Sequence, residues 1–313
     1  MANYLVTGGA GFIGSHIVEE LVERGERVRA IDNLSTGKIE NISAFLEKID
    51  FLKGDLTDIE VAKKAVKDID YILHQAAIPS VPRSINDPIS SNSTNVAGTL
   101  NLLVAAKEAK VRRIVIASSS SVYGDSEVLP KSEDMKTNPL SPYAVTKLVE
   151  ELYGSVFYKI YGLETVSLRY FNVFGPRQDP TSQYSAVIPK FITRMLEGKS
   201  PIIFGDGERS RDFTYVKNVV NANVLAASSP KIGHGEVINI ACGNRITLNE
   251  LVNKIKEIIG TNIKPEYTAP RLGDVKHSLA DINRAKKLLS YIVEVPFIEG
   301  LKATIDWYIR DGN

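Results

Sequence analysis

Short runs of apolar, often β-branched residues alternate with longer segments of helical period through the first half of the chain. The short runs predict strands at residues 4–7, 28–31, 49–52, 71–74, 114–117 and 165–169. The longer segments predict helices at residues 14–24, 96–109 and 143–161. Because strands that alternate with helices form βαβ units, we predict an α/β fold with a doubly wound, Rossmann-like parallel sheet.

The alternation becomes looser after Phe174-Gly175-Pro176, where prolines and glycines interrupt the chain. Helices are predicted there at residues 186–196, 248–259 and 298–309, and the strand-like run at 237–240 is placed to return to the main sheet. We therefore predict a smaller α/β domain interleaved with the first. The first domain takes residues 1–175 with a return segment at 212–242, and the smaller domain takes residues 176–211 and 243–313.

Composition narrows the class of protein. The 313 residues are 43% hydrophobic, and 38 Lys and Arg offset 37 Asp and Glu to a net charge of +1, which argues against nucleic-acid or membrane binding. Cys242 cannot form an internal disulfide, and the four histidines lack metal-ligand spacing. The sequence has no signal-peptide pattern and no apolar run of the roughly 18 residues that span a bilayer. We expect a cytoplasmic protein without a metal.

A glycine-rich turn follows the first predicted strand and opens the first predicted helix. Gly8 or Gly9, with Gly11 and Gly14, gives the spacing of a dinucleotide-binding turn. Glycines allow the backbone to approach a pyrophosphate closely at the helix N-terminus. Asp32, at the end of the second strand, can accept hydrogen bonds from both ribose hydroxyls and would repel a 2′-phosphate. The pattern predicts NAD rather than NADP as the cofactor.

Two ionisable side chains lie one helical turn apart in the predicted helix at 143–161. Tyr143 and Lys147 occupy positions i and i+4 and share a face. A fixed cation favours the phenolate and lowers a tyrosine pKa that is ordinarily about 10. The serines at 118–121 follow a central strand at its carboxyl end, where open α/β sheets bind ligands, although serine clusters also cap or turn chains. Together these groups predict a proton-transfer site beside the cofactor.

With these motifs the chain resembles extended short-chain dehydrogenase/reductases that act on nucleotide-sugars and, within them, the UDP-hexose 4-epimerases. The resemblance covers nearly the whole chain. Besides the glycine-rich turn it is carried by Asp32-Asn33-Leu34-Ser35-Thr36-Gly37, His74-Gln75-Ala76-Ala77, Ser119-Ser120-Ser121-Val122-Tyr123-Gly124, Tyr143-Ala144-Val145-Thr146-Lys147, Arg169-Tyr170-Phe171-Asn172-Val173-Phe174-Gly175 and Gly207-Glu208-Arg209-Ser210-Arg211-Asp212. The branch that epimerises UDP-N-acetylhexosamines is the most similar, through Arg177-Gln178-Asp179-Pro180 and Gly273-Asp274-Val275-Lys276-His277-Ser278.

The resemblance implies reversible oxidation at C4 of the sugar. Lys147 would bridge the nicotinamide ribose and hold Tyr143 as a phenolate, which removes the 4-OH proton as hydride passes from C4 to NAD. Ser119 would steady the 4-oxygen and share the proton path, with Ser120 and Ser121 as the next candidates. The 4-keto sugar would swing about its pyrophosphate and take the hydride back on its other face.

The resemblance also implies which residues hold each ligand. Besides Tyr143 and Lys147, the predicted NAD contacts are Gly8, Gly11, Phe12, Ile13, Gly14, Asp32, Asn33, Ser35, Thr36, Gly37, Asp55, Leu56, Gln75, Ala76, Ala77, Asn95, Ala117, Tyr170 and Phe171. Besides Ser119, Ser120 and Tyr143, the predicted UDP-sugar contacts are Ser80, Asn172, Val187, Lys190, Arg211, Arg271, Asp274 and Ser278. Asp55 and Asn95 are placed equally well for helix caps, and each arginine for a surface salt bridge.

The same resemblance assigns NAD to the first domain and the UDP-sugar to the smaller one, and it implies a homodimer joined by helices of the first domain. The predicted helices at 96–109 and 143–161 are candidates for this interface. Burial in the protein core explains their apolar faces equally well.

Ser278 bears on the choice of sugar. In the family, its position lies beside the C2 substituent, where a tyrosine resembles enzymes limited to UDP-Glc and UDP-Gal and a small residue resembles enzymes that admit N-acetyl groups. The resemblance therefore predicts activity on UDP-GlcNAc and UDP-GalNAc along with UDP-Glc and UDP-Gal. The alternative is a solvent-facing serine without influence on selectivity.

Three other functions stay open on the sequence. A nucleotide-sugar 4,6-dehydratase needs an acid/base pair where this chain has Ser120 and Ser121, so dehydration is disfavoured. A UDP-glucuronate 4-epimerase or decarboxylase needs a cation for the C6 carboxylate, and Arg83 and Lys190 are candidates. A non-catalytic NAD-binding regulator on the same fold is disfavoured by the retained tyrosine, lysine and serine.

Overall fold

The computed structural model describes residues 1–180, 186–270 and 276–311, and its centre is a seven-stranded sheet in the order β11-β6-β5-β4-β1-β2-β3. Every neighbouring pair in this sheet is parallel. The strands are β1 (Asn3–Thr7), β2 (Arg27–Asp32), β3 (Asp50–Lys53), β4 (Tyr71–His74), β5 (Arg113–Ser119), β6 (Glu164–Tyr170) and β11 (His234–Ile240). The predicted α/β fold with a doubly wound parallel sheet is confirmed.

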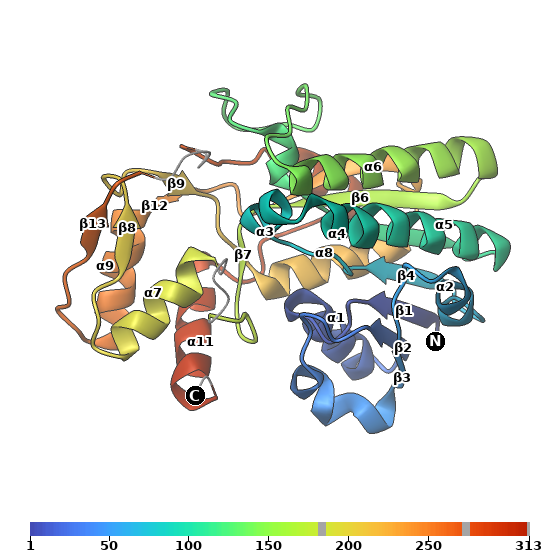
Figure 1. The fold of residues 1–313 in the computed structure, drawn as a ribbon, viewed down its shortest axis with the longest axis horizontal. Coiled ribbons are helices and arrows are strands. Elements are labelled where there is room, and N and C mark those ends of the chain that lie inside the picture. The colour runs from blue at the N-terminus through green and yellow to red at the C-terminus, as the bar shows by residue number, and fades with distance from the viewer. Residues whose placement is uncertain (181–185, 271–275, 312–313) are drawn as a thin grey trace.

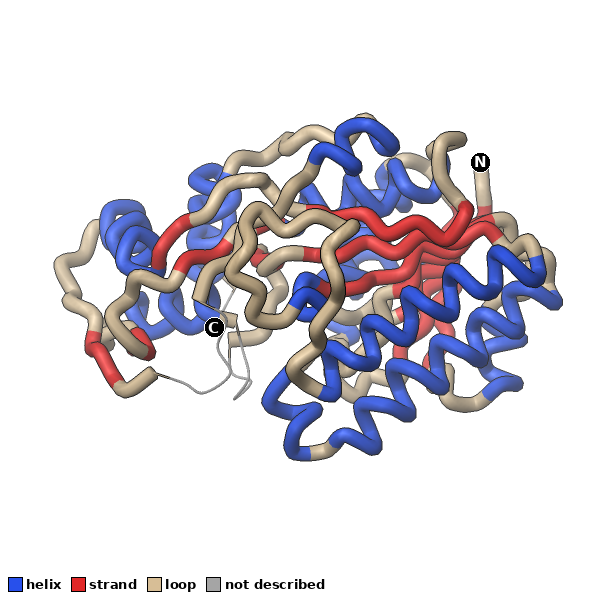
Figure 2. Tube along the Cα trace, turned by 90° about the horizontal axis from the view of Figure 1, so that it is seen from above, coloured by secondary structure: helices blue, strands red, loops and turns tan. Residues whose placement is uncertain are grey.

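Helices cover both faces of the sheet, as Figure 2 shows from above. Alternation along each strand decides which core a side chain enters. Val6 of β1 packs with α1 (Phe12–Glu23), η1 (Ile39–Lys48), α8 (Val216–Ser228) and α10 (Asn283–Leu289). Its neighbour Leu5 packs on the other face with α2 (Ile59–Ala65), α5 (Gly98–Glu108) and α6 (Pro142–Tyr161). Burial on both faces explains why these strands read as continuous apolar runs.

The strand order reverses beside β1, because β2 and β3 follow on one side of it while β4, β5 and β6 follow on the other. The connections leaving the carboxyl ends of β1 and β4 therefore run in opposite directions, and open α/β sheets bind ligands at such a point. The glycine-rich turn follows β1 and the segment from Gln75 follows β4. The topology thus brings two of the predicted ligand-binding segments together.

A second group of elements has a core of its own and lies to the left of the sheet in Figure 1. It contains α7 (Val187–Leu196), β8 (Ile202–Phe204), β9 (Ser210–Arg211), β12 (Ile246–Thr247), α9 (Leu248–Ile259), β13 (Glu266–Thr268) and α11 (Phe297–Arg310). Phe191, Leu251 and Ile305 are among the buried residues that join its helices. The expected strand at 237–240 does return to the main sheet, as part of β11. The domain boundaries stay a prediction.

The helix expected at 96–109 begins earlier than its hydrophobic period indicated. It runs continuously through α4 (Pro88–Asn92), the π-helical turn η2 (Ser93–Ala97) and α5. Asp87 caps its N-terminus by accepting from the backbone N–H of Ser90 at 3.0 Å. The remaining elements are α3 (Val81–Asn86), η3 (Ser120–Tyr123), β7 (Val173–Phe174) and β10 (Thr214–Tyr215). Across the described ranges, no helix is long and apolar enough to cross a membrane.

Candidate active site

The glycine-rich turn packs so tightly that two of its positions require glycine. Gly8 has a φ of +64°, and a Cβ there would lie 2.9 Å from the backbone of Ala76, after β4. A Cβ on Gly14 would lie 2.0 Å from the carbonyl oxygen of Gly8. Helix α1 starts at Phe12 with Gly11 as its N-cap and without a side-chain cap. Its first N–H groups therefore suit an anion, as the sequence predicted.

Asp32 lies at the carboxyl end of β2 with its carboxylate buried against the same turn. Its Oδ2 accepts from the backbone N–H of Ala10 at 3.1 Å, and its Oδ1 accepts from that of Leu34 at 2.8 Å. Burial raises the pKa of Asp32, and these two backbone hydrogen bonds oppose the rise. Gly37 passes close by, since a Cβ there would lie 2.7 Å from Oδ2. Each carboxylate oxygen keeps a lone pair that can accept from a sugar hydroxyl.

Asp55 joins the loops after β2 and β3. One carboxylate oxygen accepts from the side-chain amide of Asn33 at 2.8 Å, and the other accepts from the backbone N–H of Thr57 at 2.9 Å. The helix cap of α2 is Asp58 instead, which accepts from the backbone N–H of Glu60. The helix-cap alternative for Asp55 was therefore wrong, because the chain makes a turn before the helix starts. Leu56 is buried beside it.

The expected proton-transfer pair lies at the start of α6. The backbone N–H of Tyr143 donates to Ser84 Oγ at 3.0 Å, which fixes the helix end. Lys147 is buried, and its Nζ donates to the carbonyl oxygen of Ala117 at 2.8 Å and to Glu150 Oε2 at 3.0 Å. The Tyr143 side chain is hydrogen-bonded to Ser119, at the end of β5. The structure thus brings tyrosine, lysine and serine together.

Burial decides the direction of the Tyr143 pKa. Desolvation raises the pKa of its phenol above the usual value, whereas the Lys147 cation and the Ser119 hydrogen bond lower it. The expectation that the nearby cation gives a lowered pKa was therefore wrong in its net direction. The lysine acts with the predicted sign, but in this structure the cost of burying a phenolate is larger.

Asn95 was placed equally well for a helix cap, and that alternative was wrong because helix α4 has already begun before it. The side chain is fully buried in η2. Its Oδ1 accepts from the backbone N–H of Ile78 at 2.8 Å, and its Nδ2 donates to Thr146 Oγ1 at 3.0 Å. Thr146 donates in turn to the carbonyl oxygen of Tyr143 at 2.8 Å. Asn95 thus holds the segment after β4 against the helix that carries the tyrosine and lysine.

Ser118, Ser119 and Ser121 of the serine cluster have different environments. Ser118 donates to the buried Glu151, away from the expected site. Ser119 Oγ accepts from the backbone N–H of Ser121 at 3.2 Å and so caps η3. Among the residues that the structure describes, the buried Ser121 hydroxyl has no hydrogen-bond partner. Ser119 is therefore the serine that reaches Tyr143.

Two of the predicted cofactor contacts, Gln75 after β4 and Tyr170 at the end of β6, share one hydrogen-bonded group. The Tyr170 hydroxyl donates to Gln75 Oε1 at 3.2 Å and accepts from Asn223 of α8 at 2.8 Å. Phe171 is fully buried beyond the end of β6. Gln75 also donates to Asn223 at 3.1 Å. Three separate segments are thereby fixed around the carboxyl edge of the sheet.

On the side of the smaller group of elements, Asn172 and Ser278 lie next to each other. Asn172 Nδ2 donates to the carbonyl oxygen of Asp212 at 3.0 Å and lies 3.5 Å from Ser278 Oγ. Ser278 is 6% exposed, so the solvent-facing alternative for this serine was wrong. Arg211 donates to the carbonyl oxygens of Ser210 and Lys276 at 3.0 and 3.1 Å. Arg271 and Asp274 lie outside the described residues.

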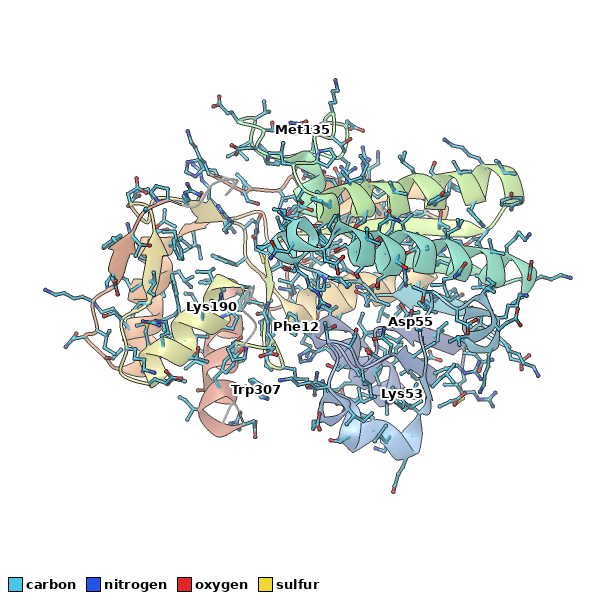
Figure 3. All side chains as sticks on the ribbon, in the orientation of Figure 1. Phe12, Lys53, Asp55, Met135, Lys190 and Trp307 are labelled. Atoms are coloured by element: carbon cyan, nitrogen blue, oxygen red, sulfur yellow. The ribbon has the colours of Figure 1, made fainter. Side chains whose placement is uncertain are left out.

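The other predicted substrate contacts lie on a helix or at a helix start. Ser80 caps α3 by accepting from the backbone N–H of Arg83 at 3.2 Å. Val187 is the first residue of α7, and Lys190 follows it on the next turn. Figure 3 shows Lys190 on α7 and Phe12 at the start of α1, on the two groups of elements. Phe12 as an NAD contact and Lys190 as a UDP-sugar contact both stay predictions.

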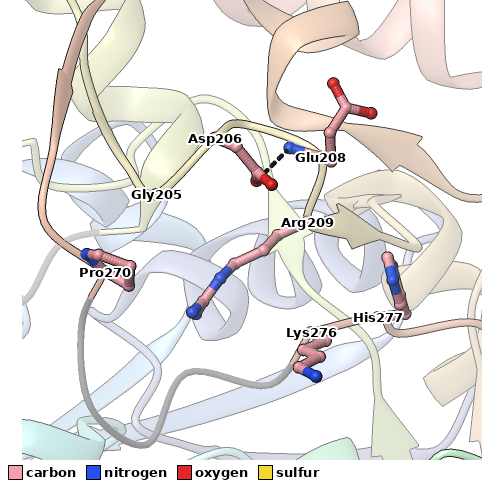
Figure 4. Close-up of a pocket in the computed structure, with 7 residues that line it drawn as sticks. All are labelled: Gly205, Asp206, Glu208, Arg209, Pro270, Lys276 and His277. Carbon is pink, nitrogen blue, oxygen red and sulfur yellow. Dashed lines mark hydrogen bonds between the residues drawn. The ribbon is translucent and has the colours of Figure 1, made fainter.

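A pocket lies beside the Arg211 strand, and Figure 4 shows its lining. Arg209, Lys276 and His277 supply its basic side chains, while Asp206 accepts from the backbone N–H of Glu208 at 3.0 Å. Ser210 Oγ lies 2.9 Å from His277 Nδ1 and joins the pocket to β9, which also contains Arg211. No metal-binding group of three or more His, Cys, Asp or Glu side chains occurs within residues 1–180, 186–270 and 276–311.

Sequence reasoning missed the buried residues that support the site. His74 Nδ1 lies 2.6 Å from Thr7 Oγ1, and Nε2 lies 2.8 Å from Thr99 Oγ1. Burial lowers the His74 pKa to about 3, so the ring is neutral. Glu150 pairs with Lys147 and was missed as well. A polar residue inside an apolar run is the signal that could have indicated the role of His74, whereas the buried position of Glu150 could not be told from the charged residues around it in the sequence.

Known proteins are similar to this chain over nearly its whole length. The model of the NAD dependent epimerase/dehydratase family matches residues 4–241. A UDP-N-acetylglucosamine 4-epimerase from Methanobrevibacter ruminantium M1, solved with UDP-N-acetylmuramic acid, is 45% identical with a TM-score of 0.94, covering 98% of each chain.

Two curated relatives differ in the sugar that they are named for. A putative UDP-glucose 4-epimerase from Methanocaldococcus jannaschii is 41% identical over 97% of both chains. A UDP-glucuronate 4-epimerase from Thermodesulfobacterium geofontis is 37% identical over 98% of this chain and 96% of its own. The resemblance to UDP-hexose 4-epimerases is therefore confirmed, and the chain belongs to the NAD dependent epimerase/dehydratase family.

Proposed function

We propose that this NAD-dependent enzyme is a UDP-sugar 4-epimerase that interconverts UDP-GlcNAc with UDP-GalNAc as well as UDP-Glc with UDP-Gal. The observation that carries the proposal is the hydrogen-bonded group of Ser119 and Tyr143, with the buried Lys147 on the same helix face. This group lies at the carboxyl edge of the sheet, next to a turn that has the shape of a dinucleotide site.

The residues around the switch point fit NAD. The uncapped N-terminus of α1 and the close backbone packing at Gly14 suit the pyrophosphate, and the Asp32 carboxylate suits the adenosine ribose. Lys147 donates two of its three N–H groups within the protein, and the third suits the nicotinamide ribose. Bound NAD supplies a reversible two-electron acceptor for C4 of the sugar.

The protein's own groups move the proton. Tyr143, as a phenolate, accepts the proton of the sugar 4-OH and returns it after the face of the sugar has changed. Ser119 is hydrogen-bonded to the same phenol and steadies the 4-oxygen. Burial raises the Tyr143 pKa, and the positive charge of Lys147 opposes this rise and so supports the phenolate.

The small side chain of Ser278 supports our proposal that the enzyme accepts sugars with an N-acetyl group at C2. Ser278 is buried beside Asn172. The family resemblance implies that this small side chain lies where a tyrosine is typical of enzymes limited to UDP-Glc and UDP-Gal. Ser278→Tyr should lower kcat/KM for UDP-GlcNAc roughly 5- to 150-fold relative to UDP-Glc, since added volume in a packed site costs roughly 1–3 kcal/mol. Ser278→Ala is the control that keeps the space. An unchanged ratio of the two substrates in Ser278→Tyr would refute this role.

UDP-glucuronate is the second candidate substrate, because one relative at 37% identity is named for it. A C6 carboxylate needs a cation, and Lys190 on α7 is placed in the smaller group of elements. Incubation with UDP-glucuronate and NAD, read by NMR, separates the products. UDP-galacturonate would support this candidate, UDP-xylose would indicate a decarboxylase, and an unchanged substrate would exclude both.

We also propose a homodimer. Val145, Leu152, Val156 and Ile160 lie at spacings of seven and four on α6 and are 42–66% exposed, so they form one apolar stripe. Helix α5 packs beside α6. Light scattering after size exclusion should give twice the 34.4 kDa chain mass, and Leu152→Glu should shift the protein to monomer. A monomeric wild type at micromolar concentration would contradict the dimer.

A further inference from the structure

Glu150 is a carboxylate buried within the catalytic helix. It is 0% exposed, one turn after Lys147, and its Oε2 lies 3.0 Å from the lysine Nζ. Its Oε1 has no hydrogen-bond partner among the residues that the structure describes. A buried carboxylate that is only half satisfied lowers stability. Packing therefore gives no reason for a charged residue at this position.

Lys147 is the ion-pair partner of Glu150, and the other ionisable groups nearby do not compete for it. Glu151, the next residue of α6, is paired with Arg169 of β6 at 2.7 Å and so has its own counter-ion. His74 of β4, which also feels the charge of Lys147, is neutral because burial lowers its pKa to about 3. Tyr143 lies on the same helix, and the Glu150 charge raises its pKa. The charge of Glu150 therefore acts on the lysine and tyrosine of the site.

We propose that Glu150 is a positioning residue for the epimerisation, which fixes Lys147 from one side and opposes the effect of the lysine charge on Tyr143. The proposal rests on the proposed function, since it assigns a role within the same site. The carbonyl oxygen of Ala117 and Glu150 Oε2 hold the ammonium between β5 and α6. A lysine held at two points keeps its place beside the cofactor with little loss of side-chain entropy.

The charge of Glu150 also reaches Tyr143. Burial is the largest cause of the raised Tyr143 pKa, Lys147 lowers that pKa, and Glu150 makes a smaller contribution that raises it. Glu150 therefore holds the lysine in place and offsets part of the effect of the lysine charge. Burial raises the pKa of Glu150 itself to about 7, so its charge is present mainly above that pH.

The test compares three variants of the NAD-loaded enzyme. Glu150→Gln and Glu150→Met remove the charge at nearly constant volume, and Glu150→Asp keeps it. The ultraviolet difference spectrum of the Tyr143 phenolate is titrated from pH 7.5 to 11, with Tyr143→Phe as the background. The pH profile of kcat with UDP-Glc is measured on the same samples, and thermal melting checks that each variant is folded.

Both uncharged variants should lower the Tyr143 pKa and move the acid limb of the kcat profile to lower pH, because the Glu150 charge raises that pKa. Glu150→Asp should leave both values near those of the wild type. Unchanged values in Glu150→Gln and Glu150→Met would overturn the proposal. Wild-type turnover of UDP-Glc tests the proposed function separately, so the two failures are distinguishable.

Discussion

Gly14→Ala perturbs the turn that we assign to the NAD pyrophosphate, at a position where the structure gives the size of the clash. The added Cβ would lie 2.0 Å from the carbonyl oxygen of Gly8 and 2.8 Å from its carbonyl carbon, whereas ordinary contact begins at 3.4 Å. Both contact atoms belong to the backbone, so no side chain can rotate away. The turn must move away from the N-terminus of α1.

This movement should weaken NAD binding more than it unfolds the protein. Overpacking costs roughly 1–3 kcal/mol of stability. Loss of one backbone hydrogen bond to a phosphate costs about 2 kcal/mol, which corresponds to an approximately 30-fold higher Kd. We therefore expect a folded variant that retains little NAD.

The assay measures NAD released on denaturation and the Kd for added NAD by calorimetry. Gly25→Ala is the matched control, because Gly25 follows the same helix, has a φ of +74° and has nothing within 4 Å of an added Cβ. This control should lose about 1 kcal/mol of stability from backbone strain and bind NAD normally. Wild-type NAD content and affinity in Gly14→Ala would refute the assignment of the turn.

Two further predictions concern buried ionisable groups. Lys147→Met should lower kcat for UDP-Glc at least about a hundredfold, since it removes the cation that supports the Tyr143 base. NMR of reaction samples quenched at set times measures kcat, and near-normal turnover would contradict this prediction. His74→Gln should flatten the fall in stability on acidification, because the His74 pKa of about 3 lies below its unfolded value of 6.5. The wild type must therefore lose stability as the pH falls from 6.5 toward 3. Urea denaturation at pH 7 and pH 5 measures the difference, and an equal pH dependence in both proteins would exclude the role of His74.

Local sequence patterns were sufficient to predict most of the fold and the position of the glycine-rich turn. The glycine spacing before the first helix predicted a turn in which Gly8 and Gly14 are now seen to pack on backbone. The i, i+4 spacing placed Tyr143 and Lys147 on one helix face, and the structure shows Ser119, which the resemblance implied, hydrogen-bonded to Tyr143. Such features depend on neighbours in sequence, so sequence reasoning reaches them.

Features that depend on tertiary partners were harder to predict. Asn95 was placed at the start of its helix, because the capped start at Asp87 lies before the amphipathic period begins. The net rise in the Tyr143 pKa follows from burial, which the order of residues along a helix does not give. Glu150 was missed because three charged residues near one another on a helix are usually solvated, and only the packing shows that its carboxylate is buried.

The conversion of UDP-GlcNAc and UDP-Glc by the NAD-loaded protein tests the central claim most directly, with product formation followed by NMR at C4. We predict UDP-GalNAc from the first substrate and UDP-Gal from the second, with no net change in NAD. Turnover of UDP-Glc alone would contradict the role given to Ser278. The absence of product from both substrates, with NAD bound, would contradict the assignment as a UDP-sugar 4-epimerase.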